Sequence, residues 1–83
     1  MSDFAHVESG FIRSVLIGET IDAKAIIGAA YATEYFMSED WKSALIPFEV
    51  MEARESACDA MTDCINDSDF TGAVDAMRRF WSL

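Results

Sequence analysis

Residues 49–69 hold the densest group of side chains that could do chemistry, and most of these are carboxylates. Seven acids fall in this segment against one cation, Arg54. Four of the acids are spaced three, four and four residues apart, which places side chains in one line along one face of a helix. We call this line the acidic ridge: Glu52, Glu55, Asp59 and Asp63. It would extend over roughly 16 Å of helix, and its chemistry is the electrostatic attraction of a cationic surface.

A row of carboxylates on this scale can occupy a protein groove that otherwise holds a nucleic-acid backbone. In size, charge and helical pattern the chain resembles the small acidic inhibitors encoded by phages, although it carries no motif of a particular family. The alternative is that the ridge is a solvated helix face that only keeps an apolar chain soluble. We expect a partner to contact the ridge, the flanking acids Glu49 and Asp67, and the apolar ring of Trp81 near the end of the chain.

A calcium loop is the second chemistry to weigh. The stretch 67–75 resembles the start of an EF-hand loop, with oxygen ligands at alternate positions and Gly72 at the sixth. The twelfth position, however, is Arg78, where the loop needs a bidentate glutamate. A cation there would repel the metal, so we expect no metal ion and a continuous helix through this stretch.

The remaining reactive residues lack partners. His6 is the only histidine, and Cys58 and Cys64 are six residues apart, outside any metal-ligand or redox spacing. On one helix the two thiols would be roughly 9 Å apart along the axis, so they cannot form a disulfide there. A line of exposed acids is also not a pocket that shifts a pKa. We therefore expect no catalytic residues and no cofactor, and a protein that is not an enzyme.

Composition limits the partners. The chain has 83 residues, a net charge of −9 and an apolar fraction of 52%, which predicts one domain over residues 1–83. The negative charge disfavours direct binding to nucleic acid or to an anionic membrane and favours a basic protein surface, as in a nucleic-acid-binding complex. The first residues are not cationic and the longest apolar run, 25–32, is too short to cross a bilayer. We expect a cytoplasmic protein.

Hydrophobic spacing predicts an all-α fold, a small antiparallel bundle of four helices. Ser2 is the expected cap of the first helix, which Gly18 ends, and Thr20 that of the second. Ser38 would begin a third element, in which Pro47 either breaks or bends the helix. We favour a break, which leaves open a fifth, short helix before Pro47. The expected later helices span residues 21–37, 47–66 and 69–81.

The segment 21–37 is apolar nearly all round, as in a helix that is surrounded by others. Small residues at 25, 28, 29 and 32 would let a neighbouring backbone approach. This helix is therefore either the centre of the bundle or a surface buried in a homodimer. Two functions follow: a non-enzymatic inhibitor or modulator that presents the acidic ridge to a basic site, or a homo-oligomeric structural or assembly subunit.

Overall fold

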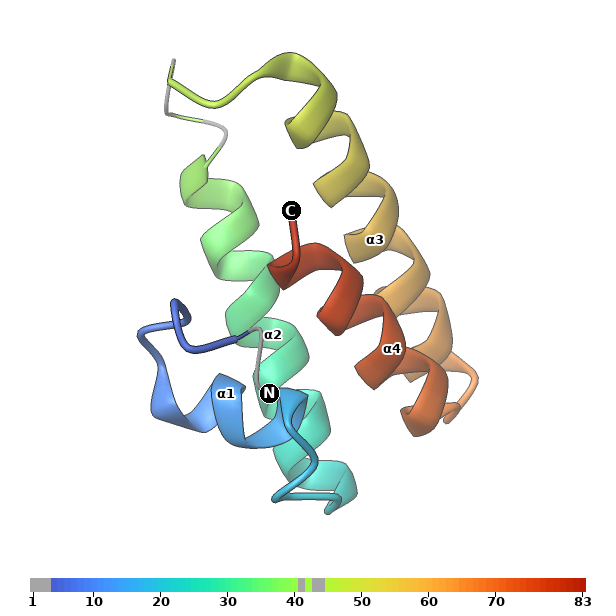
Figure 1. Ribbon diagram of the computed structural model, residues 1–83. Coiled ribbons are helices and arrows are strands. Elements are labelled where there is room, and N and C mark those ends of the chain that lie inside the picture. The colour runs from blue at the N-terminus through green and yellow to red at the C-terminus, as the bar shows by residue number, and fades with distance from the viewer. Residues whose placement is uncertain (1–3, 41, 43–44) are drawn as a thin grey trace.

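The computed structural model describes residues 4–40, 42 and 45–83, which form four α-helices and no strand. Helix α3 runs antiparallel to α2, α4 turns back along α3, and the short α1 lies across the lower half of α2 (Figure 1). The predicted all-α bundle of four helices is confirmed. The helices are α1 (Gly10–Leu16), α2 (Ala23–Asp40), α3 (Phe48–Asn66) and α4 (Phe70–Trp81).

The first helix begins later than predicted. Ser2 lies outside the described residues, residues 4–6 form a turn, and α1 begins only at Gly10. The hydroxyl of Ser9 accepts a hydrogen bond from the Ile12 amide at 3.3 Å and caps the helix. A glycine costs about 1 kcal/mol in a helix interior, and a start at Gly10 avoids that cost. Val7 is nevertheless buried, because it packs into the core from the turn.

The second helix extends past its predicted end at Met37. Ser38 lies inside the last turn of α2 and does not begin a new element, so that prediction was wrong. The physical reason is that no glycine or proline interrupts the chain between Gly28 and Pro47, while buried Met37 holds this end of α2 in a small cluster with Met51. The expected fifth helix would use residues 41, 43 and 44, which lie outside the described residues.

Pro47 separates two helices, as predicted. Residues 45 and 46 are not helical, and α3 begins directly after Pro47, which occupies the N-cap position. Proline has no amide hydrogen to donate and fixes its own φ, so it fits the start of a helix better than the interior. Because the chain is not helical just before Pro47, α3 can run in a different direction from α2.

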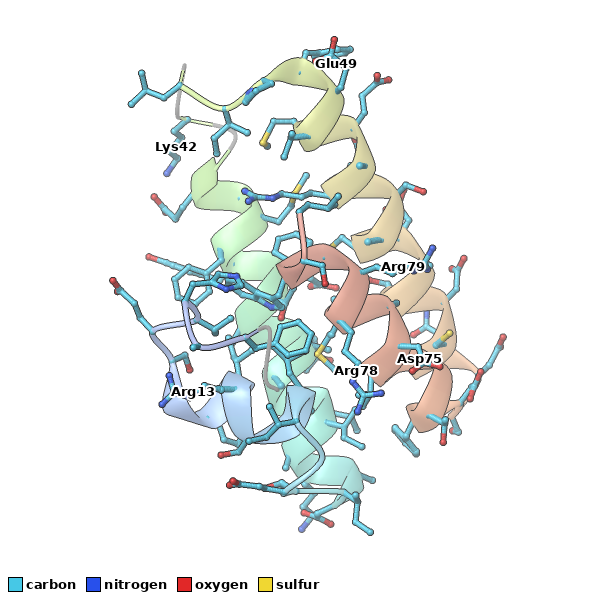
Figure 2. The ribbon with its side chains drawn as sticks, in the orientation of Figure 1. Arg13, Lys42, Glu49, Asp75, Arg78 and Arg79 are labelled. Atoms are coloured by element: carbon cyan, nitrogen blue, oxygen red, sulfur yellow. The ribbon has the colours of Figure 1, made fainter. Side chains whose placement is uncertain are left out.

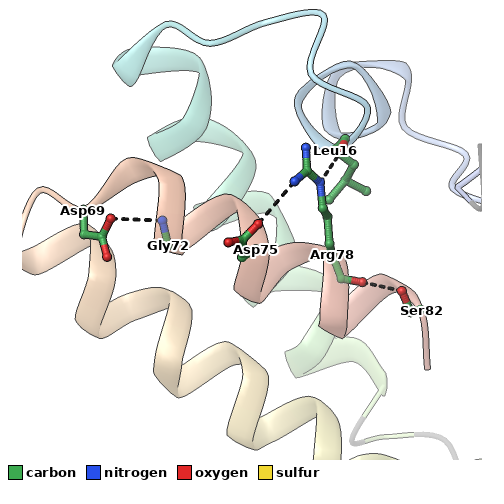
Figure 3. Close-up of polar contacts among 6 residues, drawn as sticks. All are labelled: Leu16, Asp69, Gly72, Asp75, Arg78 and Ser82. Carbon is green, nitrogen blue, oxygen red and sulfur yellow. Dashed lines mark hydrogen bonds and ion pairs between the residues drawn. The ribbon is translucent and has the colours of Figure 1, made fainter.

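The turn between α3 and α4 is a Schellman motif. The amide of Asp69 donates to the carbonyl of Cys64 at 2.8 Å, and the amide of Ser68 donates to Ile65 at 3.1 Å. Ser68 adopts a left-handed conformation with φ of 59°. Asp69 caps α4, and its carboxylate accepts the Gly72 amide at 3.0 Å (Figure 3). The motif turns α4 back along α3.

The core lies between the helices, because α1 and α3 each pack on both α2 and α4. The largest buried side chains include Ile12 and Leu16 of α1, Met61 of α3, and Met77 and Phe80 of α4. Burial of these apolar side chains supplies most of the folding free energy. The aliphatic and thioether groups fill the space around the small alanines of α2.

Helix α2 contacts all three other helices, but it is not surrounded by them. Its inner side buries Ala29 and Thr33, whereas Tyr31 and Tyr35 on the outer side are 65% and 59% exposed. The expectation that other helices of the same chain surround α2 was therefore wrong, whereas its burial in a homodimer stays a prediction. Because 83 residues cannot cover every apolar group, one side of the central helix stays open to solvent.

Hydrogen bonds from α4 fasten the N-terminal third of the chain. Arg78 Nε donates to the Leu16 carbonyl at 2.8 Å, and Arg78 Nη1 donates to Asp75 at 3.2 Å (Figure 3). His6 Nε2 lies 2.8 Å from the Trp81 carbonyl oxygen. These bonds satisfy carbonyls at the ends of α1 and α4 that have no partner within their own helices.

Candidate partner-binding surface

Helix α3 has one apolar side and one acidic side. Met51, Ala57 and Met61 are buried against the other helices. At 100° per residue the acidic ridge falls on the opposite side of α3. All seven acids of residues 49–69 are exposed. Helix α3 forms an outer edge of the molecule, with Glu49 at the end far from the α3–α4 turn (Figures 1 and 2).

The one cation of α3 lies on the other side of this helix. The Arg54 guanidinium lies 5.7 Å from the centre of the Phe80 ring, and its Nη2 donates to the Leu83 carbonyl at 3.0 Å. Within residues 4–40, 42 and 45–83, none of the seven acids forms an ion pair with a lysine or an arginine. The ion pairs found there join Lys42 to Glu39 and Arg78 to Asp75. The charge of the ridge is therefore not neutralised by the described cations.

Three of the seven acids lie outside the ridge, at or near the ends of helices. Asp69 caps α4, Asp67 is the C-cap of α3, and Glu49 lies in the first turn of α3, where the helix dipole favours an acid. The ridge acids lie beyond the first turn of α3, and like charges three and four residues apart weaken the helix by a few tenths of a kcal/mol per pair. The structure thus gives the ridge no role in holding its own helix.

Trp81 is part of the bundle and not a freely exposed ring. Its Nε1 donates to Thr33 Oγ1 at 3.1 Å. Its ring packs edge-on against Phe36 and Phe80, with distances between ring centres of 5.6 Å and 5.2 Å. The side chain is half-buried. Trp81 extends from α4 towards α2, so it does not lie on the same surface as the ridge. The exposed apolar residue at this end is Leu83.

The two thiols are poor nucleophiles. Burial raises the pKa of Cys58 to about 11, and the neighbouring carboxylates of Glu34, Asp59 and Glu55 add to the rise. Desolvation followed by the charge of Asp69 also raises the pKa of Cys64. Both cysteines are free thiols. Since the thiolate is the reactive form, neither has the environment of a catalytic cysteine.

The stretch that resembles a calcium loop is helical from Phe70 onward, so Thr71 and Gly72 belong to α4. A side-chain carbon on Gly72 would collide with the Asp69 carboxylate and come within 3.0 Å of Cys64 Sγ. The glycine therefore makes room for the helix cap. In the described part of the chain, no three histidine, cysteine or acidic residues are grouped closely enough to hold a metal ion.

The exposed tyrosines of α2 were missed as candidate surface residues. Tyr31 and Tyr35 are four residues apart, so they lie on one side of the helix, and their ring edges end in hydroxyls that tolerate water. A tyrosine pair in an otherwise aliphatic helix was the signal that could have located this open side.

The chain matches no protein-family model, no curated protein and no solved structure. None of the helices in the described ranges has both the length and the apolarity needed to cross a membrane.

Proposed function

We propose that the protein is a non-enzymatic inhibitor or modulator that docks its acidic ridge on a basic, nucleic-acid-binding site of a larger protein. One observation carries the proposal: four exposed carboxylates in a line on α3, with no ion pair to a described lysine or arginine. Their charges oppose the stability of the helix that bears them. A role in binding gives a reason for the arrangement that stability does not.

The length of the acidic ridge suits a protein groove that binds nucleic acid. Its roughly 16 Å of helix corresponds to about five base-pair steps of B-DNA, at about 3.4 Å per step. The ridge is held on a helix whose opposite side is anchored by Met51 and Met61, so its charges keep a fixed spacing. Fixed charges lose little conformational entropy on docking, and complementary charge raises the rate of encounter.

The first test is charge reversal on the ridge. We expect the pair Glu55→Lys and Asp59→Lys to weaken binding to the partner by about tenfold or more and to reduce its dependence on salt. The partner is first captured from a lysate at low salt on immobilised wild-type chain and is then purified. Affinity is measured at several salt concentrations, and the partner is tested for loss of bound DNA or RNA when the chain is added.

The matched control reverses two exposed acids away from α3, Glu8→Lys and Glu19→Lys. This control makes the same change in net charge, so it should weaken binding much less than the ridge variant. Equal effects of the two variants would mean that total charge alone matters. A partner that keeps its nucleic acid in the presence of the chain would contradict the competitive mechanism.

A further inference from the structure

A second surface lies on the open side of α2. Five residues spaced four, three, four and four apart share this side. We call them the tyrosine stripe: Lys24, Gly28, Tyr31, Tyr35 and Glu39. Thr33, on the opposite side of the helix, is fully buried and accepts the hydrogen bond from Trp81. The tyrosine stripe therefore faces away from α4 and towards solvent.

The middle of the tyrosine stripe is aromatic. Tyr31 and Tyr35 are well exposed, and Phe11 of α1 is 50% exposed. A side-chain carbon placed on Gly28 would lie 3.3 Å from the Phe11 ring, so this ring rests directly on the backbone of α2. Three exposed rings in contact with one helix face form the kind of patch that usually marks an interface.

The charges at the two ends of the stripe are reversed relative to the helix dipole. Lys24 lies in the first turn of α2 and Glu39 in the last turn, with no acid in the first turn and no base in the last. A helix alone favours the opposite arrangement. Lys24 has no ion pair among the described residues. Glu39 pairs with Lys42 at 3.3 Å, in an exposed contact of the kind that is exchanged at little cost.

We propose that a second copy of this chain packs on the tyrosine stripe, with the two α2 helices antiparallel about a two-fold axis. In this register Lys24 of each copy meets Glu39 of the other, which uses both misplaced charges. Tyr35 of each copy meets Gly28 and the adjoining Phe11 of the other, and the two Tyr31 rings flank the axis. The stripe is thus complementary to itself in charge and shape, as an isologous interface requires.

This arrangement leaves the acidic ridge accessible. Thr62 of α3 donates to Glu34 of α2 at 2.8 Å, which places α3 on the flank of α2, and all four acids of the ridge are exposed. The helix contact would run over only about 22 Å, so we expect the interface to bury a small area for a specific complex. We therefore expect a weak dimer that forms as the protein concentration rises. This expectation does not depend on whether the acidic ridge binds a partner.

Sedimentation velocity of the full chain tests the proposal, over micromolar to millimolar concentration at low and high salt. The mass of the wild-type protein should rise to that of a dimer. Lys24→Glu and Glu39→Lys should each weaken association by about tenfold, and the double variant should restore it, because the pair is then reversed but still complementary. Both substitutions suit the helix dipole, and circular dichroism confirms that the variants fold.

The ridge variant Glu55→Lys with Asp59→Lys is the control, and it should still form the dimer. Two results would overturn the proposal: a wild-type chain that stays monomeric at every concentration, or a folded double variant that does not recover association. Failure of the ridge variant to bind a partner would contradict only the function proposed above, so the two hypotheses fail separately.

Discussion

At the scale of single residues, carboxylates of the acidic ridge help to raise the pKa of Cys58, which lies towards the inner side of α3. Burial is the main cause of its raised pKa, and the carboxylates of Glu34, Asp59 and Glu55 follow. A pKa of about 11 in the folded protein, against 9.0 for an unperturbed thiol, means that folding favours the protonated form. This contribution to stability is complete below about pH 9 and is lost as the pH rises towards 11.

The pH dependence gives a direct measurement. In a Cys64→Ala background, alkylation of Cys58 near neutral pH should be about a hundredfold slower than in the unfolded chain, because the thiolate fraction falls with the raised pKa. The rate should climb until about pH 11. Neutralising Glu55 and Asp59 by Gln and Asn should speed the reaction, whereas the same changes at Glu52 and Asp63 should not. A rate that levels off near pH 9 would contradict the shift.

Residue types alone located the acids but not their environment. Spacing was enough to align the ridge, because a helical period fixes which residues share a side. It could not show that Trp81 is tied to Thr33, since that bond joins residues 48 apart in the chain. It also could not show which side of an almost wholly apolar α2 stays open, because hydrophobic residues are permitted but not required to be buried.

At the scale of elements, the two helices with clear boundaries were predicted most closely. Pro47 and the polar turn at 66–69 carry strong local signals, and α3 and α4 begin and end next to them. The start of α1 and the end of α2 have weaker signals, because Ser2, Ser9 and Ser38 all look like caps in sequence. The burial of Val7 before α1 and of Met37 near the end of α2 selects the observed helix boundaries.

The α3–α4 turn offers a prediction about stability. Ser68 has a φ of 59°, a conformation that costs a residue with a side chain roughly 1 kcal/mol and costs glycine little. Ser68→Gly should therefore raise the free energy of unfolding by about 0.5–1 kcal/mol in urea titrations. The matched change Ser56→Gly, at an exposed position inside α3, should lower it by a similar amount. Equal signs for the two variants would show that the turn is unstrained.

At the scale of the whole molecule, a net charge of −9, of which residues 49–69 contribute −6 (seven acids and Arg54), makes the folded state repel itself. Added monovalent salt should raise the melting temperature, since screening weakens this repulsion. Neutralising Glu55 and Asp59 by Gln and Asn should raise stability by a few tenths of a kcal/mol per like-charge pair removed and should flatten the salt response. Thermal unfolding over a salt series measures both effects.

The control neutralises Glu8 and Glu19 by Gln, away from α3, where each acid has fewer close neighbours of like charge. Its salt response should stay near that of the wild type. If this control flattened the response as much as the ridge variant, the repulsion would be spread over the surface and not concentrated on one helix.

The hydrogen bonds that join the first and last helices also determine when the fold can be completed. Arg78 reaches a carbonyl 62 residues earlier, and the Trp81 carbonyl meets a histidine 75 residues earlier. A ribosome makes the chain from the N-terminus, so His6 and α1 emerge long before the residues that fasten them exist. Until the last turn of α4 leaves the ribosome, the bonds from Arg78 and to Trp81 cannot form, so assembly of this bundle cannot finish before that turn has emerged.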